Sequence, residues 1–123
     1  MKADSVIFQF PMFFCRAPYL LYKYYEDVFT HGFAYGSKGK KLEGKKLILS
    51  FTMGGPKANF TGKYDLDKLI GPFECSAIYR NMKFGGYANT FSISYNIQNT
   101  PEAKERKEQL EKQAEKVLDL VQK

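Results

Sequence analysis

Long apolar runs along the chain alternate with stretches in which apolar residues recur at helical spacing. Two of the runs, residues 6–10 and 47–52, have the length of a strand, and prolines or paired glycines end them. A strand that is apolar at nearly every position is typical of a parallel sheet with both faces covered. Residues 5–14 (SVIFQFPMFF) are therefore predicted to contain a central parallel strand, although they lie at the very start of the sequence.

Three helices are predicted between and after these strands. The first begins at Pro18, where a missing N–H costs little, and extends to Val28. The second covers residues 66–82, with an interruption or a new start at residues 71–72. The third begins at Thr100, whose hydroxyl is expected to cap it. The apolar stripe of this last helix is expected to pack on one side of a sheet and consists of Leu110, Ala114, Val117, Leu118 and Val121.

A third strand is expected at residues 89–95, where TFSISY alternates and would place Phe91, Ile93 and Tyr95 on one face. Paired glycines at 85–86 are taken as a break before it. Strands alternating with helices predict parallel βαβ units in an open α/β sheet, and 123 residues make a single domain, 1–123. Ligands of such sheets bind at the carboxyl ends of the strands, where QFPMFF and TMGGP both lie.

Composition adds two features with more than one interpretation. The chain has 11 Phe and 9 Tyr, which indicate either a large aromatic core or a flat ring-binding site or subunit interface. The net charge is +6, with lysines concentrated in residues 37–46. Such a loop can attract phosphates or an acidic partner, or it can simply be solvated. Because lysines and aromatics are not interleaved there, no nucleic-acid partner is predicted.

The remaining chemistry-bearing residues exclude several classes of protein. Cys15 and Cys75 form no Cys-x-x-Cys pair, a pattern that favours the reducing cytoplasm over a disulfide-stapled secreted domain. His31 is the single histidine, so a histidine-rich metal site is excluded and no metal ligands are predicted. Polar residues and Pro11 interrupt the first apolar run, so it is not interpreted as a signal peptide or a membrane helix.

Three motifs in order, VIFQFPMFF, APYLLYKYYEDVFTHGFAYG and GKKLILSFTMGGP, resemble the flavodoxin-like NAD(P)H:quinone oxidoreductases. The resemblance is greatest to the bacterial branch that includes ancillary subunits of glutathione-gated potassium efflux systems. It implies a flavodoxin-like three-layer sandwich with a parallel sheet. Full-length members place a strand, a phosphate-binding loop, a helix and a second strand before the equivalent of Ser5, so the first two strands and first helices are expected to be lacking. The free edge of the first strand is then a predicted swapping or aggregation surface.

The resemblance also implies a site and a reaction. FMN or FAD would accept a hydride from NAD(P)H and pass it to a quinone-type acceptor. His31 and Tyr35 match a loop that reaches the active site from the partner of a homodimer, and they are the candidate catalytic residues. The residues expected to line the flavin ring are Gln9, Phe10, Pro11, Met12, Phe13, Thr52, Gly54 and Gly55, although a pair of glycines alone would equally be a strand-ending turn.

The sequence departs from the animal quinone reductases in the loop that follows the two glycines. Phe60 occupies the position of a tyrosine that assists hydride transfer, and Lys63 or Tyr64 lies near the position of a histidine. That pair of roles is therefore not assigned to this chain. Two further hypotheses remain: a non-catalytic regulatory subunit that contacts a membrane transporter, and a truncated remnant without the site for the flavin phosphate.

Overall fold

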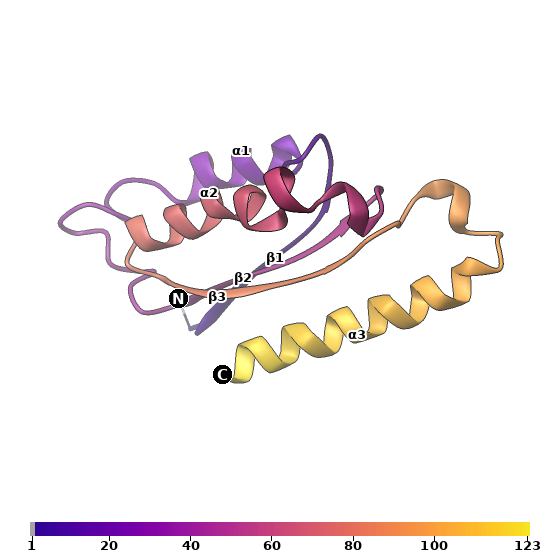
Figure 1. Cartoon of the computed structure of the whole chain (residues 1–123). Helices are drawn as coiled ribbons and strands as arrows, with labels where there is room; N and C mark the ends of the chain where they lie inside the picture. Colours follow the sequence, from indigo (N-terminus) through magenta and orange to yellow (C-terminus); the bar gives the residue numbers. More distant parts are fainter. Residues whose placement is uncertain (1) are drawn as a thin grey trace.

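The computed structural model describes residues 2–123 and consists of a three-stranded parallel sheet between two layers of helices (Figure 1). The strands are β1 (Ser5–Met12), β2 (Lys46–Met53) and β3 (Lys83–Thr90), and they lie in that order in the sheet. Helices α1 (Tyr19–Val28) and α2 (Leu66–Tyr79) cover one face, and α3 (Glu102–Gln122) lies on the other. Three single turns of 3₁₀ helix complete the fold: Lys57–Asn59, Gly62–Tyr64 and Tyr95–Ile97.

Strand β2 is the centre of the sheet and of the core. Its side chains alternate between the two faces, as the period of a strand requires. Leu49 and Phe51 pack in the large cluster under α1 and α2, whereas Ile48 packs with Val117 of α3. The side chains of Ile48, Leu49 and Phe51 have no exposed surface. The predicted strand at 47–52 is therefore confirmed, and it is the strand that both layers cover.

Strand β1 has the predicted position, but Pro11 does not end it, because the strand continues to Met12. Its environment also differs from the prediction. It pairs with β2 alone, in parallel, so it lies at the edge of the sheet among the described residues. Phe8, Phe10 and Met12 are buried toward α1 and α2. On the opposite face Ile7 is 43% exposed and Gln9 and Pro11 are exposed as well. The prediction of a central strand covered on both faces is wrong for the part of the chain that the structure describes, because α3 extends over β3 and β2.

The third strand begins earlier than predicted, and the paired glycines lie inside it. A β-bulge shifts the register of β3 so that Leu47 pairs with Phe84 and Ile48 pairs with Gly86. Gly86 has φ +101°, and a Cβ on Gly85 would lie 2.9 Å from Ile48 Cγ1. Glycine is required here because β3 passes so close to β2. Residues 91–94 continue as irregular chain, Tyr95 begins a turn of 3₁₀ helix, and only residues 89–90 of the predicted strand belong to β3.

The helices also differ in detail from the sequence prediction. Helix α2 runs unbroken through Pro72, and Gly71 lacks the Cβ that would crowd the proline ring. The Thr100 hydroxyl does not cap α3 but donates a hydrogen bond to the Ile97 carbonyl at 2.8 Å. The predicted apolar stripe of α3 is divided between two directions. Gln113 and Val117 are buried against the sheet, whereas Leu118 is 61% exposed.

Candidate functional site

The carboxyl ends of β1 and β2 lie side by side, as expected for the candidate site. In the parallel register Pro11 is opposite Thr52, and Met12 is opposite Met53. Thr52 is in turn opposite Thr90 of β3. The segments that contain the strand ends, QFPMFF and TMGGP, therefore meet at one edge of the sheet. The placement of these two motifs together was predictable from the rule that parallel strands end at the same edge.

A tight turn follows β1 and shapes one side of this edge. Phe13 and Arg16 exchange two backbone hydrogen bonds, of 2.9 and 3.0 Å. Between them Phe14 and Cys15 adopt positive φ angles of 50° and 61°, which non-glycine residues rarely do. The Phe14 side chain is 96% exposed at the tip and Phe13 is 57% exposed. The turn thus holds two aromatic rings in solvent beside the strand ends.

The eight residues predicted to line a flavin ring do not all present side chains there. Phe10 and Met12 are buried in the core under α1 and α2. Gln9, Pro11 and Phe13 are exposed, and Thr52 is half-buried. A ligand at this edge would therefore meet the backbone of residues 10–13, the exposed side chains between them, and the chain from Thr52 onward. That mixture suits a planar polar ring, which backbone N–H groups can contact from the side.

The two glycines after β2 serve different purposes. A Cβ on Gly55 would lie 3.2 Å from both Asn59 Nδ2 and Phe60 Cε2, so the loop itself leaves little room for a side chain. A Cβ on Gly54 would meet no atom closer than the Ile93 carbonyl oxygen at 3.8 Å. Gly54 is exposed and its φ is not in the left-handed region. Neither packing nor backbone conformation explains a glycine at 54, which leaves open space for the close approach of a ligand.

The loop after the glycines closes over an aromatic pair. The Phe60 and Phe91 rings lie 5.9 Å apart, and both are half-buried. Backbone hydrogen bonds from Ser92 N to Gly55 O (3.0 Å) and from Ile93 N to Met53 O (2.8 Å) hold the chain after β3 against the same loop. Phe60 therefore fixes the loop by packing. Tyr64 is 64% exposed, with the Lys63 ammonium 5.6 Å from its ring centroid.

His31 and Tyr35 lie at the other end of the sheet. They follow α1 and precede β2, and their rings make an edge-to-face contact at 5.4 Å between centroids. Tyr35 also contacts Tyr79, at the carboxyl end of α2, with centroids 5.7 Å apart. Within one chain the loop between α1 and β2, which carries both residues, lies at the end of the sheet opposite to the strand carboxyl ends (Figure 1).

Arg80, which no sequence pattern singled out, lies at the centre of this second region. The Arg80 guanidinium carbon lies 5.2, 5.4 and 6.0 Å from the ring centroids of Tyr25, Phe29 and Tyr35. Its Nη1 donates to the carbonyl and hydroxyl oxygens of Ser76. Burial raises the pKa of the Tyr25 phenol, an effect that the nearby Ser76 hydroxyl and the charge of Arg80 oppose. Only tertiary structure could reveal a cluster drawn from three separate segments.

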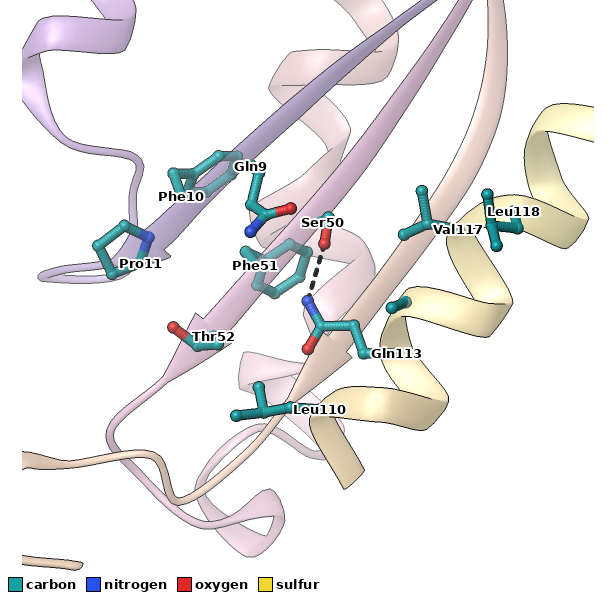
Figure 2. A pocket seen from close by; sticks show the side chains of 11 residues that line it. Gln9, Phe10, Pro11, Ser50, Phe51, Thr52, Leu110, Gln113, Val117 and Leu118 are labelled. Atoms are coloured by element: carbon teal, nitrogen blue, oxygen red, sulfur yellow. Dashed lines mark hydrogen bonds between the residues drawn. The ribbon is translucent and has the colours of Figure 1, made fainter. Parts of the chain in front are cut away.

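A groove of about 690 Å³ runs along the other face of the sheet, between β1 and α3 (Figure 2). Gln9, Pro11 and Thr52 line it, so it opens onto the candidate edge. Gln113 reaches from α3 to its floor and donates a hydrogen bond from Nε2 to Ser50 Oγ at 2.9 Å, while Thr90 donates to Gln113 Oε1 at 2.5 Å.

No helix among residues 2–123 is long and apolar enough to cross a membrane.

Parallel α/β sandwiches form a class of folds that bind ligands at the carboxyl ends of their strands. The comparison with protein families is specific: the family model described as Flavodoxin-like fold (Flavodoxin_2) matches residues 1–120. The chain belongs to this flavodoxin-like family.

Two named relatives are similar to this chain over part of its length. The Bacillus subtilis protein named uncharacterized NAD(P)H oxidoreductase YrkL is 40% identical over 85 residues, which cover 66% of this chain and 49% of that protein. The potassium-efflux system ancillary protein KefF of Salmonella newport is 36% identical over 85 residues, covering 68% of this chain and 48% of that protein. The chain thus spans about half the length of the curated relatives it matches.

A solved structure extends the comparison to the whole fold. General stress protein 14 of Treponema denticola, in complex with FMN, superposes with a TM-score of 0.83 at 27% identity. The superposition covers 95% of this chain and 66% of that one. The predicted fold and family are confirmed.

Proposed function

We propose that this chain supplies the ring-binding edge of an FMN-dependent NAD(P)H oxidoreductase. The observation that carries the proposal is Gly54, whose missing side chain leaves space at a strand carboxyl end that the fold itself does not use. Its relatives support the cofactor and the reductant, because one is named as an NAD(P)H oxidoreductase and another is in complex with FMN. When bound, FMN supplies a carrier that takes a hydride from NAD(P)H and gives it to a second acceptor.

The residues of this chain would hold and orient the isoalloxazine ring. Gln9, Pro11 and Phe13 lie on one side of the space, and Thr52 and Gly54 lie on the other. Backbone N–H groups of these segments that point toward the ring would stabilise negative charge that develops on it. The buried side chains of Phe10 and Met12 contribute indirectly, because they anchor the strand from which the backbone is presented.

His31 and Tyr35 are part of the proposal only in a homodimer. They lie at the end of the sheet opposite to Gly54, so a second copy must bring them to the site. Exposed apolar side chains of α1, such as Tyr19 (71%) and Leu20 (61%), offer a surface for such a contact. In this arrangement Tyr35 of one copy would shape the pocket in which the nicotinamide and a quinone-type acceptor bind in turn on the other copy.

Titration of the purified chain with FMN and with FAD tests the function. We expect a flavin-bound absorbance spectrum with FMN, and oxidation of NADH or NADPH when a quinone such as menadione is added. Preference between the two flavins and between the two nicotinamides is read from the same assay. The proposal would be overturned if the chain bound no flavin, either alone or together with the part of a relative that this chain does not match.

A second function has its own support. The KefF relatives are ancillary proteins of a potassium-efflux system, and this chain carries exposed lysines at 38, 40 and 41. An acidic surface of a transporter domain would be attracted to that loop. In a pull-down with such a domain, a variant with Lys38, Lys40 and Lys41 changed to Glu should lose binding. Binding that survives the change would exclude this contact.

A further inference from the structure

A second groove, which we call the α3–β3 groove, lies between helix α3 and the carboxyl end of strand β3. Helix α3 packs on β3 along this side of the sheet (Figure 1). The groove has a volume of about 460 Å³, within the range of ~300–1,000 Å³ that small-molecule sites occupy. The residues proposed to contact a flavin ring do not line it. Its polar lining includes Lys57, Ser92, Arg106, Gln109, Lys112 and Lys116.

The charged side chains of this lining all have one sign. Lys57 comes from the loop after β2, whereas Arg106, Lys112 and Lys116 come from α3, so two distant segments bring four cations to one groove. No Asp or Glu is among the described residues that line it. Glu105 lies 3.5 Å from Arg106 Nη1 but is outside the lining. A groove with this excess of positive charge attracts anions.

Arg106 has one edge of its guanidinium without a partner. Nη1 contacts Glu105 and donates a hydrogen bond to Gln109 Oε1 at 3.2 Å. Nε is buried and unpaired, and Nη2 donates no hydrogen bond to residues 2–123. Nε and Nη2 form the planar fork with which arginine binds two oxygens of one carboxylate or phosphate group. A small rotation of this side chain, which is 21% exposed, would present the fork to the groove.

The other groups of the lining are donors beside a small apolar area. The Ser92 hydroxyl is half-buried and has no hydrogen-bond partner among residues 2–123, and the same holds for the exposed Lys112 ammonium. Ala88 and Phe91 supply apolar surface. A buried donor without an acceptor is costly, so a ligand rich in oxygen acceptors suits this lining better than an apolar one.

We propose that the α3–β3 groove binds the diphosphate group of a small molecule, with the Arg106 fork on a phosphate and the lysine ammoniums around it. A phosphate monoester carries about −1.5 to −2 charge near pH 7, so two linked phosphates match four cations better than one phosphate does. The organic part of the ligand would lie against Ala88 and Phe91. The proposal goes beyond the oxidoreductase and requires neither a flavin nor NAD(P)H.

Calorimetric titration of the 123-residue chain without flavin tests the proposal. The probes are pyrophosphate, ADP and adenosine. We expect one-to-one binding of pyrophosphate and of ADP, and no binding of adenosine, because the phosphates make the charged contacts. Tighter binding of ADP identifies a nucleotide as the kind of ligand, and tighter binding of pyrophosphate identifies the inorganic ion. The proposal would be overturned if neither anion bound, or if adenosine bound as tightly as ADP.

Two variants of the groove have a matched control on the same helix. Arg106→Lys keeps the charge but removes the fork, so ADP binding should weaken at least about tenfold. Lys112→Gln should weaken it at least about threefold. Lys107→Gln should leave the affinity unchanged, because Lys107 is equally an exposed lysine of α3 but does not line the groove. Equal losses in the two Lys→Gln variants would show a non-specific attraction to a basic chain and would overturn the proposal.

A resonance of Arg106 reports the contact directly. In ¹⁵N spectra the Nε–H signal that Arg106→Lys removes should shift when ADP is added, because an unpaired donor gains an acceptor. A signal that stays in place at saturation would contradict the proposal. Circular dichroism checks the fold of each variant, and Lys112→Gln, at an exposed position, keeps the test valid if Arg106→Lys unfolds the chain.

Failure of this site and failure of the proposed function are distinguishable. Gly54 does not line the groove, so Gly54→Ala should bind ADP as the unaltered chain does. A chain that binds ADP but no FMN supports the groove and contradicts the oxidoreductase, and FMN binding without ADP or pyrophosphate binding does the reverse. Tighter binding of a duplex DNA oligonucleotide than of ADP at about 150 mM salt would assign the cations to nucleic acid, which also overturns the proposal.

Discussion

Gln113 of α3 donates a hydrogen bond from Nε2 to Oγ of Ser50 in the middle of β2, at 2.9 Å. The same side chain accepts a hydrogen bond from Thr90 of β3 through Oε1. All three residues are buried. One amide thus fastens the last helix to two strands whose carboxyl ends form the candidate site. A polar residue at a core position of α3 makes the register of the helix on the sheet specific.

Replacing Gln113 by Leu should destabilise the fold by about 1–3 kcal/mol, since the Ser50 and Thr90 hydroxyls lose a buried partner. Urea unfolding followed by circular dichroism measures the change. Gln109→Leu is the control, because Gln109 lies one turn earlier and hydrogen bonds with Glu105 near the surface. Equal stability of the two variants would show that the network contributes nothing.

Gly54→Ala tests the ring site without disturbing the fold. The new methyl group would lie 3.8 Å from its nearest neighbour, so the free energy of unfolding should change by less than about 0.5 kcal/mol. The affinity for FMN should fall at least about tenfold, because the methyl group occupies the space required by the ring. Fluorescence titration with FMN measures the loss. Undiminished flavin affinity would place the ring elsewhere.

Gly85→Ala, in contrast to Gly54→Ala, should lower the free energy of unfolding. A Cβ there would lie 2.6 Å from the Lys46 side chain and 2.9 Å from Ile48 Cγ1 at the bulge of β3. Because Ile48 is fully buried and cannot move freely, we expect a loss of about 1–3 kcal/mol in urea unfolding. Gly54→Ala serves as the control for an added methyl group. An unchanged unfolding midpoint would mean that the strands separate easily at this position.

Tyr25 should make stability fall at alkaline pH. Burial raises the pKa of its phenol, so the folded chain holds the proton at pH values where the unfolded chain has lost it. The free energy of unfolding should therefore decline above about pH 10, the ordinary value, until the raised pKa is passed. Tyr25→Phe keeps the ring contact with Phe8 and should reduce that decline. Urea unfolding at pH 8 and pH 10.5 compares the two, and parallel profiles would contradict the expectation.

Substitutions of Tyr35 test whether a second copy of the chain contributes to the acceptor pocket. If its ring reaches the site of the partner, Tyr35→Ala should raise KM for the quinone by about tenfold with FMN affinity unchanged, while Tyr35→Phe should retain most of the effect of the ring. The contact with Tyr79 makes a folding check necessary. Tyr95→Ala, at an 85% exposed position, is the control. A KM that does not respond to Tyr35→Ala would remove this residue from the site.

The sequence predicted some parts of the candidate site and could not predict others. Apolar runs that stop near Pro11 and Gly54 predicted where both strands end, although β1 continues through Pro11 to Met12, and parallel pairing predicted that the two ends meet. The sequence could not predict why each of these positions is a glycine. Gly55 is crowded by its own loop and Gly85 by β2, whereas a Cβ on Gly54 would meet no described atom closer than 3.8 Å, and only the tertiary structure distinguishes these cases. The same limit explains the misplaced third strand, since a glycine pair predicts a break unless the packing that needs it is known.

The sequence by itself determined the alternation of strands and helices, the strand-ending motifs and hence the fold class, because hydrophobic periodicity and turn residues act locally. Tertiary structure alone decided which elements are covered. It made β2 the central strand, left one face of β1 open, and gave α3 a second apolar stripe that includes Leu118. Burial is a property of neighbours brought from distant parts of the chain, and the pattern of apolar residues records only the capacity to be buried.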